Sequence, residues 1–493
     1  MTAMTAFLNK ITTFSTQKYK PIFEGILNQG FLFQLILAVW AGLTSSFFLL
    51  VLKQSANLTL AEFALVATGQ ATVALVFSLF ARHMARPAMR IFTIFSLFVA
   101  FAGFLYLALR PEDFYFIFGI ASVAMGISAA LHGLQLSIPM TEAMRASAHK
   151  KAQSSLALVL TVLPIASALT LAFSGALAEK STDIFYAVAA FATLGVGVYI
   201  FSAKPELPGK PVGHHPIPKP VLYLMILGWM QNISHNILMK LLVPLLIYAY
   251  SKSLLLSGSM LGLVVLLGFF ISNQKAGQRK RAKRVVVHFF LGGGGVLYLC
   301  SFTLSPKLAM MAYIFLACGG LIYIASPLLT KLARVLHAPE KIVFCGLLGL
   351  MFTRLLWGAV DAMFAPVEGE RSLWFLIFIM VITGIHFVFG RLWTLGFMTR
   401  LRELEADKDG HEHEARKTHF KTYTRWGFAT GIAGGLTVYL IATFFELEAV
   451  ERIAGWLIIA LGVWLGLCLT LYKTAMNIYK RKTPEETALS RRI

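Results

Sequence analysis

Long apolar segments alternate with short polar and basic stretches along almost the whole chain. Each segment has about 20 residues, the length that an α-helix needs to cross the hydrocarbon of a bilayer. The pattern predicts an all-α polytopic membrane protein with about 14 transmembrane helices. The predicted spans are 31–53, 60–82, 89–109, 113–137, 154–178, 182–202, 221–249, 254–273, 285–304, 308–330, 342–364, 372–398, 424–446 and 450–475.

The composition supports insertion into a membrane. Hydrophobic residues make up 57% of the 493 residues, charged residues make up 14%, and the mean hydropathy is +0.72. The core of a soluble domain does not need this much apolar sequence. All four cysteines lie within apolar segments, so we expect them to pack between helices and to form no disulfide framework.

Basic residues are divided unequally between the two sides of the predicted membrane. Of the 44 Lys and Arg residues, seven fall in one set of loops and three within spans, so the other 34 lie in the opposite loops and the termini. Because loops rich in Lys and Arg stay in the cytoplasm, we expect both termini on the cytoplasmic side of a bacterial inner membrane. The net charge of +21 then reflects topology and indicates no nucleic-acid partner.

A short basic loop occurs twice and predicts an internal duplication. The dipeptide Ala-Arg, followed after four residues by Pro, stands at 81–87 and again at 333–339, an offset of 252 residues. This offset places the first span on the ninth and the third on the eleventh, which predicts two six-helix halves with two helices inserted between them. In the alternative, spans seven to twelve form the second half, and the repeated loop argues against it. The predicted domains are an interfacial N-terminal segment 1–30, a first half 31–202, a cytoplasmic linker 203–220, an inserted pair with its basic loop 221–284, a second half 285–476 containing a cytoplasmic loop 400–423, and a basic tail 477–493.

Two sequence patterns resemble the major facilitator superfamily in its fourteen-span variety, over residues 31–476. The family's loop after the second span carries Gly, Asp and several basic residues, of which only the basic ones are present here. The family's small-residue pattern in the fifth span is approached in the fifth and thirteenth spans. The resemblance implies a secondary transporter whose central cavity is lined by spans one, four, nine and twelve. The residues that carry it are Arg82, Arg86 and Arg90 in the loop, Pro164, Ser167 and Ala168 in the fifth span, and Gly427, Gly431, Gly434 and Gly435 in the thirteenth.

Polar side chains within the spans are the candidates for a substrate site. Arg391 lies five residues after His386 in the twelfth span, and a buried guanidinium suits a carboxylate or phosphate through two parallel hydrogen bonds. The alternative is a structural arginine that bonds to backbone carbonyls. The first half has no charged residue in the middle of a span, and its candidates are the neutral residues Gln34, Thr44, Ser45, His132 and Gln135.

Arg354 and Asp361 lie seven residues apart in the eleventh span, two turns along one helix face. An ionised group in hydrocarbon costs about 2.5–3.5 kcal/mol, so unpaired charges are rare there. The spacing predicts a gating or proton-coupling pair. The alternative is that Asp361 lies near the outer end of the span, in contact with water.

The seventh span carries the densest polar stripe of any span. The resemblance makes this span part of the peripheral inserted pair, where polar groups facing lipid would be costly. Either the stripe packs inward or binds a partner, or the division into six, two and six helices is wrong. The stripe consists of Gln231, Asn232, His235, Asn236 and Lys240.

These patterns favour a secondary active transporter that moves a small, anionic or amphiphilic solute by alternating access, coupled to protons or another ion. A flippase for a lipid or lipid-linked precursor on the same fold, and a non-transporting membrane scaffold, are the alternatives. The spans contain no nucleophile constellation and no metal-binding helix motif, so the sequence predicts no enzyme, no cofactor and no metal site. The His- and Glu-rich stretch at 411–414 is typical of a solvated loop.

Overall fold

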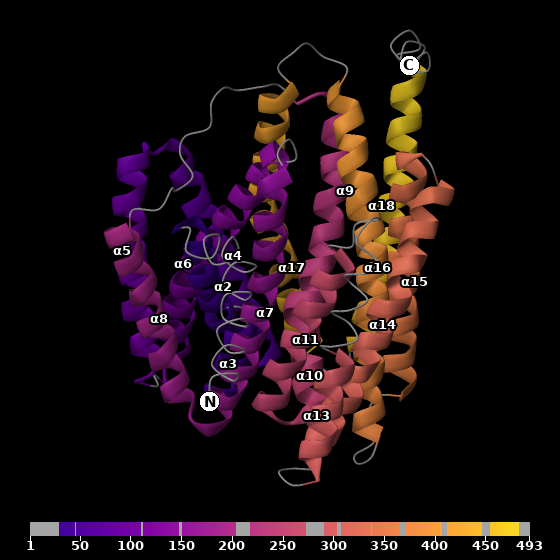
Figure 1. Ribbon diagram of the computed structural model, residues 1–493. Coiled ribbons are helices and arrows are strands. Elements are labelled where there is room, and N and C mark those ends of the chain that lie inside the picture. The colour runs from indigo at the N-terminus through magenta and orange to yellow at the C-terminus, as the bar shows by residue number, and fades with distance from the viewer. Residues whose placement is uncertain are drawn as a thin grey trace, which may run out of the picture.

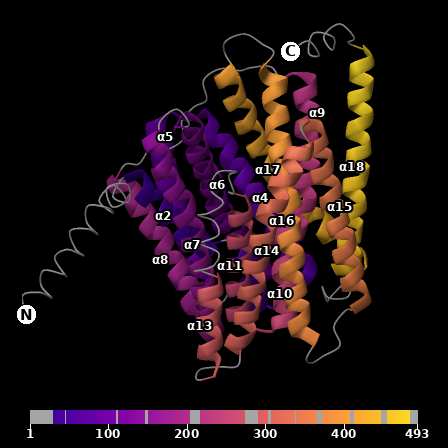
Figure 2. The same ribbon diagram turned by 45° about the vertical axis from the view of Figure 1, so that its right-hand side comes forward.

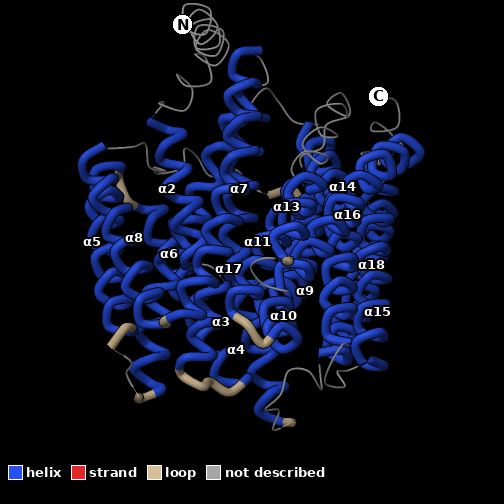
Figure 3. Tube along the Cα trace, turned by 60° about the horizontal axis from the view of Figure 1, so that its bottom comes forward, coloured by secondary structure: helices blue, strands red, loops and turns tan. Residues whose placement is uncertain are grey.

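The computed structural model describes residues 29–44, 46–109, 112–146, 150–203, 217–272, 290–302, 307–336, 338–364, 371–406, 412–445 and 454–482. Helices fill nearly all of these ranges, and no strand occurs in them (Figure 3). The first set of helices is α2 (Gln29–Thr44), α3 (Ser46–Ser55), α4 (Leu60–His83), α5 (Arg86–Leu107), α6 (Phe114–Ala146), α7 (Lys150–Lys180) and α8 (Thr182–Ala203). The remaining helices are α9 (Lys219–His235), η1 (Asn236–Leu242), α10 (Val243–Ser251), α11 (Leu254–Ser272), α13 (Gly292–Ser301), α14 (Lys307–Leu336), α15 (Pro339–Phe364), α16 (Arg371–Ala406), α17 (Glu412–Phe444) and α18 (Ala454–Lys482).

The helices have the length and apolar surface of membrane spans. In the described ranges, 12 helices are long and apolar enough to cross a membrane, with α2 and α3 forming one span and α9, η1 and α10 another. The all-α polytopic prediction is therefore confirmed. In α14 the apolar stretch is the shorter Met311–Ile324, so the count of fourteen spans stays a prediction.

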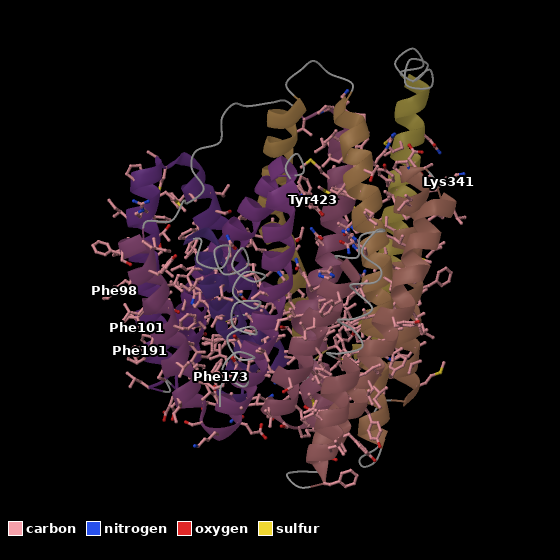
Figure 4. The ribbon with its side chains drawn as sticks, viewed as in Figure 1. Phe98, Phe101, Phe173, Phe191, Lys341 and Tyr423 are labelled. Atoms are coloured by element: carbon pink, nitrogen blue, oxygen red, sulfur yellow. The ribbon has the colours of Figure 1, made fainter. Side chains whose placement is uncertain are left out.

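Large apolar side chains also cover the outside of the bundle. Phe98 on α5 is 59% exposed and Phe191 on α8 is 60% exposed, and both point away from the protein (Figure 4). Apolar groups of this size on an outer surface need lipid around them, because exposure to water would be unfavourable. The outer face of the α5 and α8 pair is therefore a lipid-facing surface.

Two groups of helices pack in the same pattern, side by side in Figure 1. In the first, α5 packs against α6 and α8, α4 against α6, and α2 against α7. In the second, α15 packs against α16 and α18, α11 against α16, and α9 against α17. The two groups therefore match helix for helix.

Glycines on α11 and α17 bring the two groups into contact along two seams. A Cβ atom added to Gly258 of α11 would lie 2.4 Å from the carbonyl oxygen of Leu171 on α7, and one added to Gly262 would lie 2.6 Å from that of Ala168. On the second seam, a Cβ added to Gly435 of α17 would lie 3.2 Å from the carbonyl oxygen of Ala64 on α4. Small residues four apart allow this close backbone approach in lipid.

The repeated basic loop is a helix-to-helix turn in both copies. In the first copy α4 ends at His83 and α5 begins at Arg86, and in the second α14 ends at Leu336 and α15 begins at Pro339. The helices after the two copies, α5–α8 and α15–α18, pack alike within their groups. The repeated loop therefore relates α5 to α15, and the three helices that follow each of them correspond at larger offsets.

The pair of spans predicted as peripheral lies inside the bundle. The span α9–η1–α10 contacts α16, α17 and α18, and α11 contacts α7 and α16. The helices α13 and α14 instead pack against each other and against α16 and α11, and no pair in the first group matches them. The predicted division, in which 221–284 is the insertion, stays a prediction.

Helices extend beyond the predicted spans at one end of the bundle. The described parts of the predicted loop 400–423 are helical, since α16 runs to Ala406 and α17 starts at Glu412. These ends and the end of α18 rise above the first-group helices (Figure 1) and stand out again after rotation (Figure 2). The predicted segment 1–30 lies outside the described residues except for its last two, and most of the linker 203–220 and of the tail 477–493 also lies outside them.

Candidate functional site

The span α9–η1–α10 changes its helical geometry at its centre. Asn236–Leu242 forms a π-helical segment between two α-helices. Pro244 follows in the next turn, and because proline has no N–H it cannot donate to the carbonyl of Lys240 four residues earlier. Such π segments are frequent at functional sites. The polar stripe of the seventh span lies at this change of geometry.

One side of the stripe packs inward against α17. The Nδ2 atom of Asn232 donates to Oη of Tyr423 at 3.1 Å, and Nδ2 of Asn236 donates to Oγ1 of Thr430 at 3.0 Å. Tyr423, labelled in Figure 4, also stacks on Trp229 with ring centroids 6.4 Å apart. Of the alternatives that the sequence left open, inward packing is the one observed for these residues, and Gln231 is also buried.

The other side of the stripe meets α15 and α16. The ring of His235 stacks on that of His386, with centroids 5.8 Å apart and planes 14° apart. The neighbouring Ser234 accepts a hydrogen bond from Nη1 of Arg354 and donates to the carbonyl oxygen of Leu461 on α18 at 3.4 Å. The structure thus brings together His235, His386 and Arg354, which sequence reasoning assigned to three separate groups.

Lys240 completes this basic group from η1. Its charge and that of Arg354 both act on the His235 ring. Its side chain is exposed, while the surrounding protein still desolvates its ammonium group. In the described residues no carboxylate forms an ion pair with Lys240 or Arg354.

The antiparallel packing of α15 and α16 sets the depth of these residues. A Cβ on Gly346 would lie 2.4 Å from the backbone nitrogen of Trp393, and one on Gly396 would lie 2.6 Å from that of Val343. Because the two helices are antiparallel, each step forward along α15 from Gly346 is matched by one step back along α16 from Trp393. Arg354 therefore lies level with Ile385, next to His386, and Trp357 lies level with Ile382, next to Thr383, one turn further along.

Several buried polar atoms in this region have no hydrogen-bond partner. Arg354 is fully buried, and its Nε and Nη2 atoms form no hydrogen bond with any residue that the structure describes. The same holds for Nε1 of Trp357, Oγ1 of Thr383 and Nδ1 of His386. The result is a buried group of polar atoms, mostly hydrogen-bond donors, around one guanidinium.

Asp361 is held by a different partner from Arg354. Its Oδ1 atom accepts a hydrogen bond from Oη of Tyr250 at 2.9 Å, and both side chains are buried. Tyr250 in turn packs on Phe375 of α16, with ring centroids 4.2 Å apart. The two members of the predicted pair therefore bond to different parts of the same span, Arg354 to Ser234 near its middle and Asp361 to Tyr250 at its end.

Arg391 lies on another face of α16 from His386. It follows Gly384, which approaches Leu321 of α14, by seven residues, and Phe387, which approaches Gly268 of α11, by four. Residues four and seven apart share a helix face, so Arg391 belongs to the face that turns toward α11 and α14. It is half-buried and has no hydrogen bond to any described residue.

Of the candidates predicted in residues 31–202, the structure describes the side chains of two, Gln34 and Thr44, and neither contacts Arg354, His235 or His386. Gln34 on α2 is half-buried, and the buried Thr44 donates to the Trp40 carbonyl at 3.0 Å and accepts from Ser128 of α6 at 2.9 Å. Ser45 lies outside the described residues, and His132 and Gln135 lie on α6 where side chains are not described. Thr44 thus has a structural role between α2 and α6.

Sequence reasoning did not select Ser234, Tyr250, Trp357 and Thr383. Single Ser, Thr, Tyr and Trp residues are common in apolar helices, and no spacing marks these four. Ser234 stood within the polar stripe, so its position there was the one available signal.

Comparisons with known proteins identify the fold. No protein-family model and no curated protein sequence matches the chain. The chain is similar to a crystal structure of a point mutant of the nucleoside transporter NupG, with a TM-score of 0.58 and 8% identity over 90% of this chain and 98% of that one. Another NupG structure (TM-score 0.45, 10% identity, 90% and 98% covered) and a bacterial homologue of the human drug peptide transporters (0.46, 13%, 92% and 99%) are less similar. The chain therefore has the fold of this NupG structure.

Proposed function

We propose that the chain is a secondary transporter that carries a small anionic solute between two halves of a helix bundle. The observation that carries this proposal is Lys240, whose side chain is exposed and has no carboxylate partner in the described residues. A lysine that faced lipid at this depth would cost several kcal/mol. We therefore propose that Lys240 faces an aqueous path between the halves, where an anion would supply its counter-charge.

The packing of the helices supports a new division of the chain for this mechanism. The proposed second half consists of α9–α11 together with α15–α18, and α13–α14 is the inserted pair. This division matches the halves helix for helix, and it places the glycine seams α4–α17 and α7–α11 at equivalent positions. Rocking along such seams is the usual motion of transporters built from repeats.

His235 and His386 are proposed to assist Lys240 at the solute site. Both rings lie beside the π-helical segment, and an imidazole can donate to an anionic oxygen or exchange a proton as the path changes access. This arrangement would allow an anion to move together with a proton.

Uptake into proteoliposomes tests the proposal. The full chain is reconstituted, and uptake of labelled organic anions is compared with that of neutral and cationic solutes. We expect uptake of an anion, and at least about tenfold weaker affinity in Lys240→Gln, because a hydrogen bond to a charged group contributes about 1.5–3 kcal/mol. Lys473→Gln, which changes an exposed lysine of α18, is the matched control.

The alternatives predict other outcomes of the same experiment. A flippase would move a fluorescent lipid between leaflets and take up no soluble anion. A scaffold would do neither while remaining folded. Normal anion uptake by Lys240→Gln would remove the basis for the anionic site.

The orientation in the membrane is also proposed. The positive-inside bias places both termini and the α16–α17 connection in the cytoplasm. A cysteine at Glu412 should react with an impermeant maleimide only after the cells are permeabilised. Labelling of intact cells at this position would reverse the topology.

A further inference from the structure

Arg354 is a fully buried cation that the solute path does not use. None of its surface is exposed, so an organic solute in the proposed path does not reach it in this conformation. Its Nη1 atom donates to Ser234, but that hydroxyl is neutral and already donates to Leu461. The positive charge therefore has no counter-charge among the described residues.

The free edge of the guanidinium has the geometry of an anion ligand. Nε and Nη2 are the two atoms that have no partner, and their N–H groups lie side by side and parallel on one edge of arginine. This fork is the one that binds anions with two hydrogen bonds. Because Nη1 is held by Ser234, the fork is fixed in direction before any ligand arrives.

The surrounding atoms are mostly hydrogen-bond donors. Trp357 follows Arg354 by three residues on the same face of α15, and its Nε1 atom can only donate. From α16, Thr383 lies one residue from the level of Trp357 in the helix register, and His386 lies one residue from the level of Arg354. The hydroxyl of Thr383 and Nδ1 of His386 have no hydrogen-bond partner among the described residues.

A buried charge without a partner costs several kcal/mol, and each unsatisfied buried donor adds a further penalty. We infer that Arg354, Trp357, Thr383 and His386 form an occluded site for a small monovalent inorganic anion, of the size of a halide. The ion would neutralise Arg354 and accept hydrogen bonds from the unpaired donors. All four side chains are nine-tenths or more buried, so a ligand bound by them would be enclosed by protein, and a monatomic ion is the smallest anion that could neutralise Arg354.

Melting curves of the purified full chain in detergent test the inference without any variant. Sodium gluconate is replaced stepwise by sodium chloride or sodium bromide at constant ionic strength. We expect a saturable rise of at least about 2 °C with either halide, because an ion that binds only the folded state stabilises it by mass action. A melting temperature that is independent of chloride and bromide would overturn the inference.

Two variants locate the ion. Arg354→Gln should remove the halide dependence and should melt in gluconate at or above the wild-type temperature, because it no longer buries an unpaired charge. Thr383→Val keeps the charge and removes one donor, so it should need several-fold more chloride for the same rise. If Arg354→Gln is folded and keeps the full halide dependence, the ion binds elsewhere and the inference fails.

Two controls distinguish this site from the proposed solute site, with which it shares His386. Arg391→Gln changes an arginine on the opposite face of α16 and should keep the halide response. Lys240→Gln should also keep it while losing anion uptake. A loss of the halide response in Lys240→Gln would show that both residues hold the same ion, and the separate site would then be rejected.

Discussion

Tyr250 donates a hydrogen bond of 2.9 Å to Asp361, and this bond joins the end of the span α9–η1–α10 to α15, whose Arg354 contacts Ser234 near the middle of the same span. Asp361 is fully buried. A buried carboxylate in a membrane bundle needs such a partner, and it can carry a proton if the partner changes with access.

The first prediction concerns proton coupling through Asp361. Asp361→Asn keeps the shape and removes the charge, so we expect it to abolish accumulation driven by a pH gradient while exchange of solute across the membrane persists. Both rates are measured in proteoliposomes. Tyr250→Phe is the companion variant, and the loss of one charged hydrogen bond should lower the free energy of unfolding by about 1.5–3 kcal/mol. Unchanged pH-driven uptake in Asp361→Asn would leave Asp361 with a structural role alone.

The second prediction concerns the seam between α7 and α11. A Cβ at Gly258 would lie 2.4 Å from the carbonyl oxygen of Leu171 and 2.9 Å from Cα of Gly175, and backbone atoms cannot move aside as a side chain can. Gly258→Ala should therefore lower the melting temperature by several degrees, as overpacking costs about 1–3 kcal/mol.

Gly427→Ala is the matched control for the seam. Nothing lies within 4 Å of a Cβ at Gly427, so alanine should be neutral there or stabilise the helix by up to about 1 kcal/mol. Equal melting temperatures for the two variants would show that the helices of the seam are not in backbone contact.

The third prediction concerns Glu179, which links the two proposed halves. From the end of α7 it accepts hydrogen bonds from the backbone nitrogen of Leu254 at 2.6 Å and of Leu255 at 3.3 Å, and from Oγ of Ser253 at 3.1 Å. A carboxylate at a helix N-terminus satisfies free N–H groups and opposes the positive end of the helix dipole. Glu179 thus holds the first turn of α11 against α7.

Glu179→Ala should loosen this end of the bundle. We expect faster hydrogen exchange at the amides of the first turn of α11 in detergent. The exchange rate should rise about tenfold for each 1.4 kcal/mol by which the free energy of local opening falls. Glu112→Ala, which changes another acidic residue at the start of a helix, is the control and should leave these amides unchanged. Exchange rates that match the wild type in Glu179→Ala would assign the stability of this turn to other contacts.

Hydropathy alone predicted most helix bounds well, because the bilayer sets the length of a span. The predicted span 182–202 is α8 (Thr182–Ala203), and 254–273 is α11 (Leu254–Ser272). The helix α16 ends later than predicted, at Ala406, and α17 begins earlier than predicted, at Glu412, because polar residues continue both helices beyond the predicted spans. The local sequence fixes the length of the helix part that crosses the membrane, because that part must be apolar. It does not fix how far the helix continues outside the membrane.

The place of the inserted pair could not be predicted in the same way. The repeated loop precedes α15, so it relates only the helices that follow it, α15–α18. Hydropathy does not tell which pair of spans is the insertion, and only packing shows that α11 carries the seam glycines Gly258 and Gly262. Likewise, the seven-residue spacing predicts that Arg354 pairs with Asp361, whereas each has another partner in the structure. The register between α15 and α16, set by glycines against aromatic residues, is what brings Arg354 to His386.

The last prediction concerns Arg391, which the sequence favours as the ligand of an anionic solute. The structure turns its face of α16 toward α11 and α14, whereas His386 faces α9. We therefore expect solute affinity in Arg391→Gln to stay within about twofold of the wild type, while Lys240→Gln loses at least about tenfold. Affinity is measured by binding in detergent, beside a melting curve for each variant, so that a loss of folding is not taken for a loss of binding. Arg391→Lys distinguishes the two roles further, because lysine keeps the charge but cannot form the two parallel hydrogen bonds of a guanidinium. If Arg391→Gln and Arg391→Lys both bind about tenfold more weakly and still melt like the wild type, Arg391 is the anion ligand, and the solute path runs along the α11 side of α16 instead of past Lys240.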